Sequence, residues 1–390
     1  MPGRDPTDRY ETLMPRNTAV RSVEAIPVSY REPTDHNRFR SVCLVKITGE
    51  DGQVGWGECC AYFTEAALAA AKIVEGMAPM VVGQSALHTE KIWHALRKHS
   101  WWYGTGAGIA SIAISGIDIA LWDLKGKMLG VSVLDLLGGP VRDELPAIAS
   151  LHGTKARIED MAEEIAGHTA TGLHGAKVGF GKYGNAHLGF DRDRDIAFVR
   201  QVTEAMGPGK SLMIDCGVNN FWDIPTAIGR AKAFEEMGVA WLEEPLGHDD
   251  PEGYAALRAA TGIRIAYGER ESTPRGVKRI VDTGTVDVIG LDPGRIEGIT
   301  GFVKAADICA LSRRQANAHN FSTAIVGAAS QALSFASPAC NLLELQPVYG
   351  PAQTDLVDRP IWHRNGFVDM PQGPGLGIEV NESLVRGMAI

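Results

Sequence analysis

The sequence predicts an α/β fold: a (β/α)8-type TIM barrel with an N-terminal α+β capping domain. First, short apolar runs alternate with amphipathic helical stretches over residues 144–347, an alternation that is typical of a parallel sheet. Second, ionisable residues lie at or near the ends of successive runs, 23 to 28 residues apart, which allows one strand, one helix and two loops. These residues are Asp215, Glu243, Glu269, Asp292, His319 and Glu344. Barrels of this kind carry their chemistry where the strands end, so a run of acids followed by a base indicates an active site.

Composition limits the classes of function. The chain has 390 residues, of which 45% are apolar and 22% charged, and this length suits two domains better than one. The net charge of −9 argues against nucleic acid as a partner, because phosphate binding needs clustered Lys and Arg. No apolar run reaches the ~20 residues of a membrane helix, and the N-terminus lacks the apolar segment of a secretory signal. Six scattered cysteines without zinc-type spacing suit a reducing compartment, so we expect a cytoplasmic protein.

The N-terminal part reads as strands followed by helices, which predicts a separate α+β domain over residues 18–143. Residues 1–17 are polar and are expected to form a mobile tail. A Glu-Asp-Gly turn joins the second and third strand-like runs as a hairpin. The predicted strands cover 19–30, 40–49 and 53–58, and the predicted helices cover 64–83, 84–100 and 108–129. The last of these helices is apolar on most sides and should be buried.

The barrel is predicted to occupy residues 144–347. Its eight strands are expected at 146–153, 175–180, 211–216, 240–245, 264–269, 287–292, 315–320 and 341–347, with amphipathic helices between them. A long loop, residues 181–195, precedes the second of these helices. Beyond Pro347 the pattern becomes irregular, and residues 348–390 are expected to return to the capping domain as a strand and a helix.

Three acids, Asp215, Glu243 and Glu269, lie at the ends of adjacent predicted strands. Carboxylates that come this close repel one another unless a cation neutralises them, and oxygen ligands on a rigid frame suit Mg²⁺. For any one of the three, a loop cap or a salt bridge is an equally good interpretation, whereas the combination favours a metal site with one Mg²⁺ per subunit. Glu244, which follows Glu243, should point to the other side of its strand and serve a structural role.

A base is predicted beside the acids. Asp292 and His319 end neighbouring strands, so the carboxylate can bond one ring nitrogen, fix the tautomer and leave the other nitrogen as a better base. Lys177 ends the second strand, across the barrel mouth, where a lysine in a cavity lined by acids can act as acid or base. Taken singly, such a histidine or lysine is more often an ordinary loop or solvated residue.

The order of these motifs resembles the mandelate racemase subgroup of the enolase superfamily. The residues that carry the resemblance are Lys177 in AKVG, Asp215 in MIDC, Glu243 in WLEEP, Glu269 in YGE, Asp292 in LDPGRIEGITG and His319 in AHNF. SGIDIALWDLKGK, followed by LLGG, is similar to a helix of the same family's capping domain. The likeness extends from about residue 18 to the end, and it is far more specific for the superfamily than for a substrate.

The resemblance implies a reaction class. Mg²⁺, bound by Asp215, Glu243 and Glu269, would hold the substrate carboxylate, and a base would remove the α-proton to give an enediolate. His319, paired with Asp292, would be one acid/base, and Lys177 would be another on the opposite face. Glu344 matches a carboxylic acid that donates to the substrate carboxylate.

The chain also departs from the family pattern. The family usually has Lys-x-Lys on the second barrel strand, where this chain has Gly175 in place of the first lysine, so Lys177 could instead bind substrate. Lys182, in the following loop, is a possible substitute, although a loop lysine is commonly solvated. Arg270 and Arg295 could each bind a second polar end of the substrate or pair with a nearby acid.

We expect dehydration of a sugar acid, a small-molecule carboxylate, by a homo-oligomer that binds neither nucleic acid nor membrane. Polar residues of the cap loops, Arg31, His36, Arg38 and Arg40, suit a hydroxylated anion. A racemase or lactone cycloisomerase using the same residues is the first alternative. Metal-dependent hydrolysis usually needs several histidine ligands, where this site offers one. A non-catalytic binder is disfavoured by the intact acids and His319.

Overall fold

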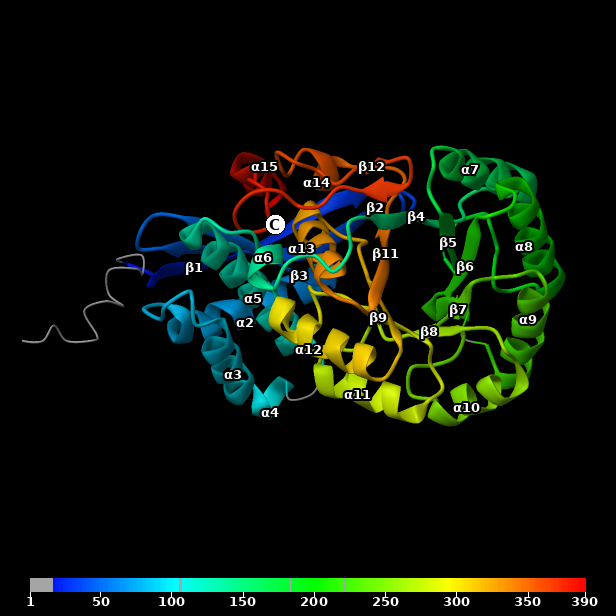
Figure 1. Cartoon of the computed structure of the whole chain (residues 1–390), viewed down its shortest axis with the longest axis horizontal. Coiled ribbons are helices and arrows are strands. Elements are labelled where there is room, and N and C mark those ends of the chain that lie inside the picture. Colours follow the sequence, from blue (N-terminus) through cyan, green and yellow to red (C-terminus); the bar gives the residue numbers. More distant parts are fainter. Residues whose placement is uncertain (1–16, 105–106, 183, 221) are drawn as a thin grey trace, which may run out of the picture.

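The computed structural model describes residues 17–104, 107–182, 184–220 and 222–390. The predicted tail, residues 1–17, therefore lies almost entirely outside the described part of the chain. The molecule has two packed parts, with the capping elements on the left of Figure 1 and the barrel on the right. Among the described helices, none combines the length and the apolar character needed to cross a membrane.

The cap is an antiparallel three-stranded sheet covered by helices. The strands are β1 (Val20–Glu32), β2 (Arg38–Gly49) and β3 (Val54–Tyr62), in that order across the sheet. The helices are α2 (Thr64–Val81), α3 (Thr89–His99), α4 (Trp101–Gly104), α5 (Ile109–Leu129) and α6 (Val133–Leu136). Helix α5 is apolar on most sides because it packs between the sheet and the barrel, and most of its residues are buried. A glycine there matters: a Cβ on Gly116 would lie 2.5 Å from Cys59 Sγ of β3, so the small residue permits close packing.

Eight parallel strands form a closed barrel, which confirms the predicted fold class. They are β4 (Leu145–His152), β5 (Gly175–Phe180), β6 (Ser211–Cys216), β7 (Trp241–Glu243), β8 (Ile265–Tyr267), β9 (Val288–Leu291), β10 (Gln315–Ala318) and β11 (Cys340–Leu345). Each strand pairs with the next, and the ring closes where Leu343 of β11 pairs with Ala147 of β4. Their carboxyl ends therefore meet around one mouth.

Helices follow the first seven strands. They are α7 (Ile158–Ala170), α8 (Arg192–Met206), α9 (Ile224–Glu236), α10 (Pro251–Ala260), α11 (Pro274–Thr283), α12 (Gly298–Leu311) and α13 (Ala324–Ala336). A short 3₁₀ turn, η1 (Val218–Asn220), lies between β6 and α9. After β11 the structure has only the four-residue α14 (Pro351–Thr354) in the place of an eighth helix. Helices α7 to α11 run along the outer side of the barrel, while α12 and α13 lie toward the cap (Figure 1).

The C-terminal segment contacts both parts of the molecule. The hairpin of β12 (His363–Arg364) and β13 (Phe367–Val368) adds to the barrel, because β13 pairs antiparallel with β4. The last helix, α15 (Glu382–Met388), returns to the cap, where the Ile390 amide donates to the Pro27 carbonyl of β1 at 3.0 Å. In place of the expected strand to the cap, the structure has isolated bridges: Ala389 pairs with Val28 of β1, Gly375 with Ser132, and Val380 with Val357.

The barrel interior beneath the mouth is filled by apolar side chains. Ile148, Met213, Trp241, Ala266 and Val288 form one buried cluster from five strands. Residues i and i+2 of a strand face the same side, so the residues two positions beyond Met213 and Trp241 face the barrel axis one layer higher. Those residues are Asp215 and Glu243. The alternation of the two strands thus places Asp215 and Glu243 directly above apolar side chains of the same strands.

Candidate active site

A cavity of about 730 Å³ lies at the carboxyl ends of the barrel strands, under the cap. Asp215, Glu269 and His319 line it, together with cap residues Arg40 and Tyr62. The mouth therefore holds acids, a histidine and an arginine within one enclosed space. The cavity coincides with the strand ends at which the sequence predicted an active site.

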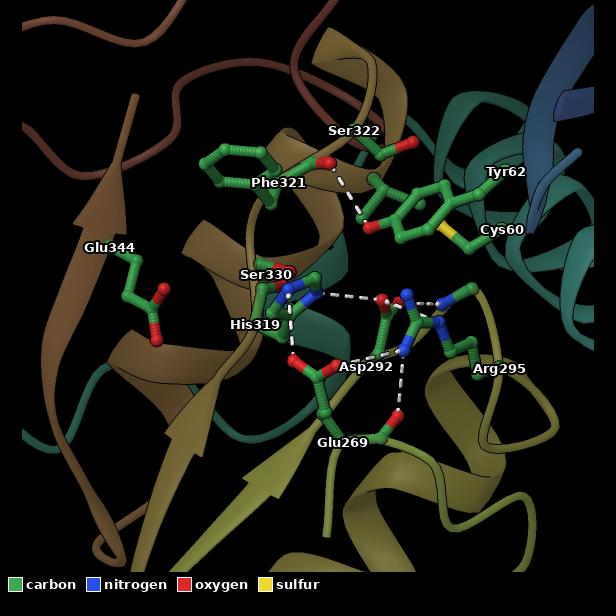
Figure 2. A network of polar contacts seen from close by, with 12 residues as sticks. Cys60, Tyr62, Glu269, Asp292, Arg295, His319, Phe321, Ser322, Ser330 and Glu344 are labelled. Atoms are coloured by element: carbon green, nitrogen blue, oxygen red, sulfur yellow. Dashed lines mark hydrogen bonds and ion pairs between the residues drawn. The ribbon is translucent and has the colours of Figure 1, made fainter. Parts of the chain in front are cut away.

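The histidine and aspartate expected to pair are in contact. Asp292 directly follows β9 and His319 directly follows β10, and His319 Nδ1 lies 2.8 Å from Asp292 Oδ2 (Figure 2). The Gly294 amide donates to the other oxygen of Asp292 at 2.8 Å, and the Ser330 hydroxyl donates to the His319 carbonyl at 2.9 Å. Burial opposes ionisation of Asp292, but Arg295 and His319 together hold its pKa below the ordinary value. An ionised acceptor at Nδ1 fixes the proton there and leaves Nε2 as the reactive nitrogen.

Nε2 of His319 faces Glu269. The two atoms His319 Nε2 and Glu269 Oε2 lie 3.4 Å apart, and Arg295 Nη1 lies 3.6 Å from the other oxygen of Glu269. Burial would raise the pKa of Glu269, yet His319 and Arg295 lower it well below the ordinary range. Arg295 is itself held in place, because it donates to the Glu269 carbonyl at 3.0 Å and lies 4.6 Å from the Tyr62 ring centroid. Arg295 therefore acts here as a partner of Glu269 and Asp292.

The sequence suggested that Lys177 ends its strand, but it is the third residue of β5, which continues to Phe180. Its side chain is 3% exposed, and its ammonium lies 3.2 Å from Glu243 Oε1, 2.9 Å from Glu344 Oε1 and 3.9 Å from Asp215 Oδ2. Burial alone would lower the pKa of Lys177, but these carboxylates raise it well above the ordinary value. An ammonium held this way gives up its proton with difficulty, so the geometry disfavours Lys177 as a base.

Glu344 is not among the residues that line the cavity, and its expected contact with a substrate carboxylate stays a prediction. Its side chain is fully buried on β11, where it accepts from Ser150 Oγ at 2.8 Å and from the amide of Asn317. Figure 2 shows Glu344 on the side of His319 away from Arg295. With Lys177 as a third partner, Glu344 lies directly behind Lys177 and Ser150, which both line the cavity.

The three predicted metal ligands are all carboxylates, but their oxygens do not already surround one point. Asp215 and Glu243 pair in register on β6 and β7, and Asp215 and Glu269 line the cavity, where their side chains are 18% and 23% exposed. Glu243 instead faces Lys177 and accepts from the Trp241 indole at 3.0 Å. Within the described residues, no group of three or more His, Cys, Asp or Glu side chains stands ready to hold an ion. Carboxylate oxygens are nevertheless the type of donor that Mg²⁺ prefers, and all three acids lie at the same barrel mouth.

Glu244 lines the cavity, so the expectation that it faces away from the site was wrong. Strand β7 ends at Glu243, and Glu244 has a left-handed φ of 44°, which breaks the alternation on which the expectation rested. Glu244 pairs closely with Arg270, and its Oε1 is buried without a hydrogen-bond partner. Burial, with Glu269 nearby, raises the pKa of Glu244 to about 7. A buried carboxylate oxygen that lacks a partner, beside another acid, supports the fit of this mouth to a cation. The doubled Glu in WLEEP was its only sequence signal.

The cap contributes side chains from its β1–β2 loop. Asp35 Oδ1 lies 3.3 Å from Nδ1 of His152, the last residue of β4, and Arg40 donates to the Phe321 carbonyl. Burial lowers the pKa of His152 to about 4, and its ring stacks on Phe321 with centroids 5.2 Å apart. The pairing of His152 with Asp35 had no signal in the sequence, because it joins two domains. Arg31 and His36, also proposed for this loop, are not among the residues that line the cavity.

The second cap loop, residues 101–107, reaches the cavity through its last described residue. Ala107 lines the cavity, and the Gly108 amide donates to Ser272 Oγ of the barrel at 3.2 Å. Trp102 is 80% exposed and lies outside the cavity lining. Residues 105–106 lie outside the described part of the chain.

Comparison with known proteins gives a consistent assignment for both parts of the chain. Residues 17–138 match the family model for the mandelate racemase / muconate lactonizing enzyme N-terminal domain, and residues 160–384 match the model described as enolase C-terminal domain-like. The two matched ranges correspond to the cap and to most of the barrel.

Individual relatives act on sugar acids or their lactones. The chain is 32% identical over 353 residues to the D-galactarolactone cycloisomerase of Agrobacterium fabrum, covering 88% of this chain and 89% of that protein. It is 33% identical over 355 residues to the L-rhamnonate dehydratase of Saccharopolyspora erythraea, covering 87% and 83%. Among solved structures, the 3,6-anhydro-D-galactonate cycloisomerase from Zobellia galactanivorans superposes with a TM-score of 0.85 at 28% identity, covering 95% of this chain and 99% of that one.

Proposed function

Because this chain belongs to the mandelate racemase and muconate lactonizing enzyme group of the enolase superfamily, we propose that it dehydrates a sugar acid. In this reaction the proton α to the carboxylate is removed and the β-hydroxyl leaves as water. The product is a 2-keto-3-deoxy acid.

The pairing of His319 with Asp292 carries the proposal. The Asp292 carboxylate accepts the Nδ1 proton, so the free electron pair of the ring is at Nε2, the nitrogen nearer the cavity acid Glu269. A base oriented in this way can remove a proton from a carbon bound beside it, provided that the negative charge that develops is stabilised. The His319 side chain is only 8% exposed, and Arg295 lines the cavity beside it.

Members of this superfamily generally use Mg²⁺. We assign Asp215, Glu243 and Glu269 as the residues that would hold one ion per subunit, because they lie at or within two residues of the carboxyl ends of three adjacent strands. When bound, the ion supplies positive charge that holds a carboxylate and stabilises the charge that develops on it. Lys177 supports this set from below by fixing Glu243 and Glu344.

The cavity suits a hydroxylated anion. Arg38, Arg40 and Arg270 bring positive charge to its wall, while Asp35 and His152 offer further hydrogen-bonding groups. Guanidinium groups bind carboxylates and hydroxyls with defined geometry. A linear sugar acid, with one carboxylate and several hydroxyls, matches this set of groups better than an apolar acid does.

The test is a screen of pentonic and hexonic acids and their lactones with Mg²⁺, in which 2-keto acid is measured. We expect at least one acid to give 2-keto product, and a chelator should abolish the activity. Asp215→Asn, Glu243→Gln and Glu269→Gln should each be inactive while keeping the wild-type circular dichroism. If the wild-type protein formed no 2-keto acid and exchanged no α-hydrogen with solvent for any acid, the proposal would fail.

A cycloisomerase acting on a sugar lactone is the second candidate, supported by the named activities of two of the relatives above. The same residues would move a proton without loss of water. Exchange of the α-hydrogen with solvent deuterium, or lactone opening, with no 2-keto acid formed, would favour it. A homo-oligomer remains the expected assembly, and light scattering of the purified protein measures it.

A further inference from the structure

Position 179 of β5 faces the cavity beside Asp215 but carries no side chain. In the strand register Gly179 lies opposite Asp215 of β6 and opposite His152 of β4, and both of these residues line the cavity. Lys177 lies opposite Met213, one inward-facing layer deeper. The strand therefore has no side chain level with Asp215, and Lys177 lines the cavity only from the layer below.

The side chain of Lys182 fills this gap. A Cβ built on Gly179 would lie 2.6 Å from Lys182 Cε, 2.7 Å from His152 Cδ2 and 3.1 Å from Lys182 Cγ, so the lysine stem crosses over the glycine beside the His152 ring. On the other side of the stem, a Cβ on Gly217 would lie 3.3 Å from Lys182 Cδ and from Nζ. Lys182 itself lines the cavity. Its ammonium thus stands near Gly217, two residues beyond Asp215.

The turn that carries Lys182 is fixed in this position. Gly181 has a left-handed φ of 65°, which favours glycine, and its amide donates to the Leu188 carbonyl at 2.8 Å. The Asn219 amide group donates to the Gly181 carbonyl at 2.9 Å. A Cβ on Gly181 would lie 2.1 Å from Asn220 Oδ1, so a larger residue could not keep this path.

The two lysines differ in their surroundings. Lys177 has three carboxylates within 4 Å. No ion pair of the described residues includes Lys182, although its stem is packed against Gly179. An ammonium that is held near the reacting groups without a carboxylate partner is suited to give its proton to a substrate oxygen.

We propose that Lys182 is the catalytic acid that protonates the leaving hydroxyl, in the position where the strand itself has only Gly179. This assignment rests on the proposed dehydration. Strands β5 and β10 are separated in the ring by β4 and β11, so Lys182 and His319 approach the cavity from different sides.

His319 Nε2 takes the α-proton, and the electron pair of that C–H bond is first held on the substrate carboxylate as an enediolate, which can take a solvent proton back. That electron pair then forms the double bond between the α- and β-carbons as the β-carbon–oxygen bond breaks. The leaving oxygen takes a proton from the Lys182 ammonium and departs as water. The resulting enol tautomerises to the 2-keto acid, and His319 and Lys182 return to their starting protonation states by exchange with solvent.

The experiment separates proton removal from loss of water. With an acid that the wild-type protein dehydrates, Lys182→Met should lower kcat for 2-keto acid by ~10²–10⁴ while α-hydrogen exchange with deuterium oxide continues, because His319 is intact. His319→Asn should lose both. Lys155→Met, which removes a lysine of the neighbouring β4–α7 loop, is the matched control. Dehydration by Lys182→Met at the wild-type rate, or loss of exchange as complete as in His319→Asn, would overturn the assignment.

Gly179→Ala tests the packing without removing a charge. The new methyl group should displace the lysine stem and lower kcat about as far as Lys182→Met, and the double variant should be no slower than Lys182→Met alone. Gly167→Ala in α7, where an added Cβ meets nothing within 4 Å, is the control. Unchanged kcat in Gly179→Ala would contradict the assignment.

A labelling measurement gives a readout that does not depend on turnover. Acetylation of Lys182 by acetic anhydride, followed by mass spectrometry, should be faster in Gly179→Ala than in the wild-type protein, and equal rates would contradict the packing. Failure of the proposed function would instead show in the wild-type protein, which would neither exchange nor dehydrate any acid.

Discussion

The imidazole of His319 stands between two carboxylates that it meets through different nitrogens. Asp292 accepts at Nδ1, and Glu269 lies beside Nε2. Both acids have pKa values held below the ordinary range by the cations around them, so both are ionised at neutral pH. The role of the ring therefore depends on the distinct surroundings of its two nitrogens.

Substitution of His319 should lower kcat more than substitution of Asp292. His319→Asn should lower kcat by ~10²–10⁴, because it removes a positioned base, and Asp292→Asn should lose a large part of that through the wrong tautomer. Steady-state kinetics and α-hydrogen exchange on the same substrate provide the measurement. His94→Asn, at an exposed histidine of α3, is the control. Wild-type turnover and exchange in His319→Asn would mean that the pair is not catalytic.

Lys177 should matter for stability. Removing its charge leaves Glu243 and Glu344 buried without a cation, and breaking a buried ion pair typically costs ~3–5 kcal/mol. Lys177→Met should therefore lower the free energy of unfolding by about that much in urea denaturation. Adding Glu344→Gln should restore part of the loss, because it removes one of the unpaired charges.

Lys278→Met, at an exposed lysine on α11, is the matched control and should change stability little. If Lys177→Met were as stable as the wild-type protein, the ammonium would not be needed to neutralise the buried acids.

At the scale of elements, the cap is attached to the barrel through a helix end. Asp118 of α5 accepts from the amide and the hydroxyl of Thr300 at 2.8 and 2.7 Å, in the first turn of α12. The close approach requires Gly298, where a Cβ would lie 2.4 Å from Asp118 Oδ2. A carboxylate at a helix N-terminus satisfies its open N–H groups.

The charge of Asp118 should make this attachment depend on pH. Burial raises the pKa of Asp118 to about 7. A carboxyl group whose folded-state pKa lies above its unfolded value contributes stability that is complete below the unfolded pKa and is lost as the pH rises through the folded one. The stability of the wild-type protein relative to Asp118→Asn should therefore fall between pH 4 and pH 8, by about 1.4 kcal/mol per unit of pKa difference at most.

Urea unfolding of both proteins across that pH range measures the effect. Asp307→Asn, at an exposed position of the same helix α12, should show a difference from the wild-type protein that does not vary with pH. A constant difference for Asp118→Asn would show that its carboxyl group does not titrate as described.

At the scale of the whole molecule, the two domains divide the work. The acids and His319 come from the barrel, whereas Asp35 of the β1–β2 loop and Arg38 and Phe39 at the start of β2 reach the same cavity from the cap. A wall supplied by a separate domain can vary without disturbing the reacting groups.

Exchange of residues 33–39 for the corresponding loop of a relative should change the order of kcat/KM among sugar acids. The Mg²⁺ concentration for half-maximal activity should stay the same, because the assigned ligands lie in the barrel. The exposed turn at residues 50–53, between β2 and β3, is the control exchange. An unchanged order of preference would show that this loop does not select the substrate.

The sequence by itself determined the fold class and the ring of ionisable groups at its mouth. Repeated βα units require a parallel sheet, and residues at the ends of such strands must meet at one edge. For that reason the contact of His319 with Asp292 could be predicted from two strands that end 27 residues apart.

The tertiary structure alone decided which groups face the cavity. Lys177 lines the cavity from one layer deeper than Asp215 because the register of β5 is set by its hydrogen bonds to β4 and β6, and no local pattern reveals that register. Glu244 enters the cavity because its left-handed backbone ends the alternation of β7. Lys182 reaches over Gly179 because the loop folds back across its own strand. This path is fixed by hydrogen bonds of Gly181 to Leu188 in the same loop and to Asn219 in the turn after β6.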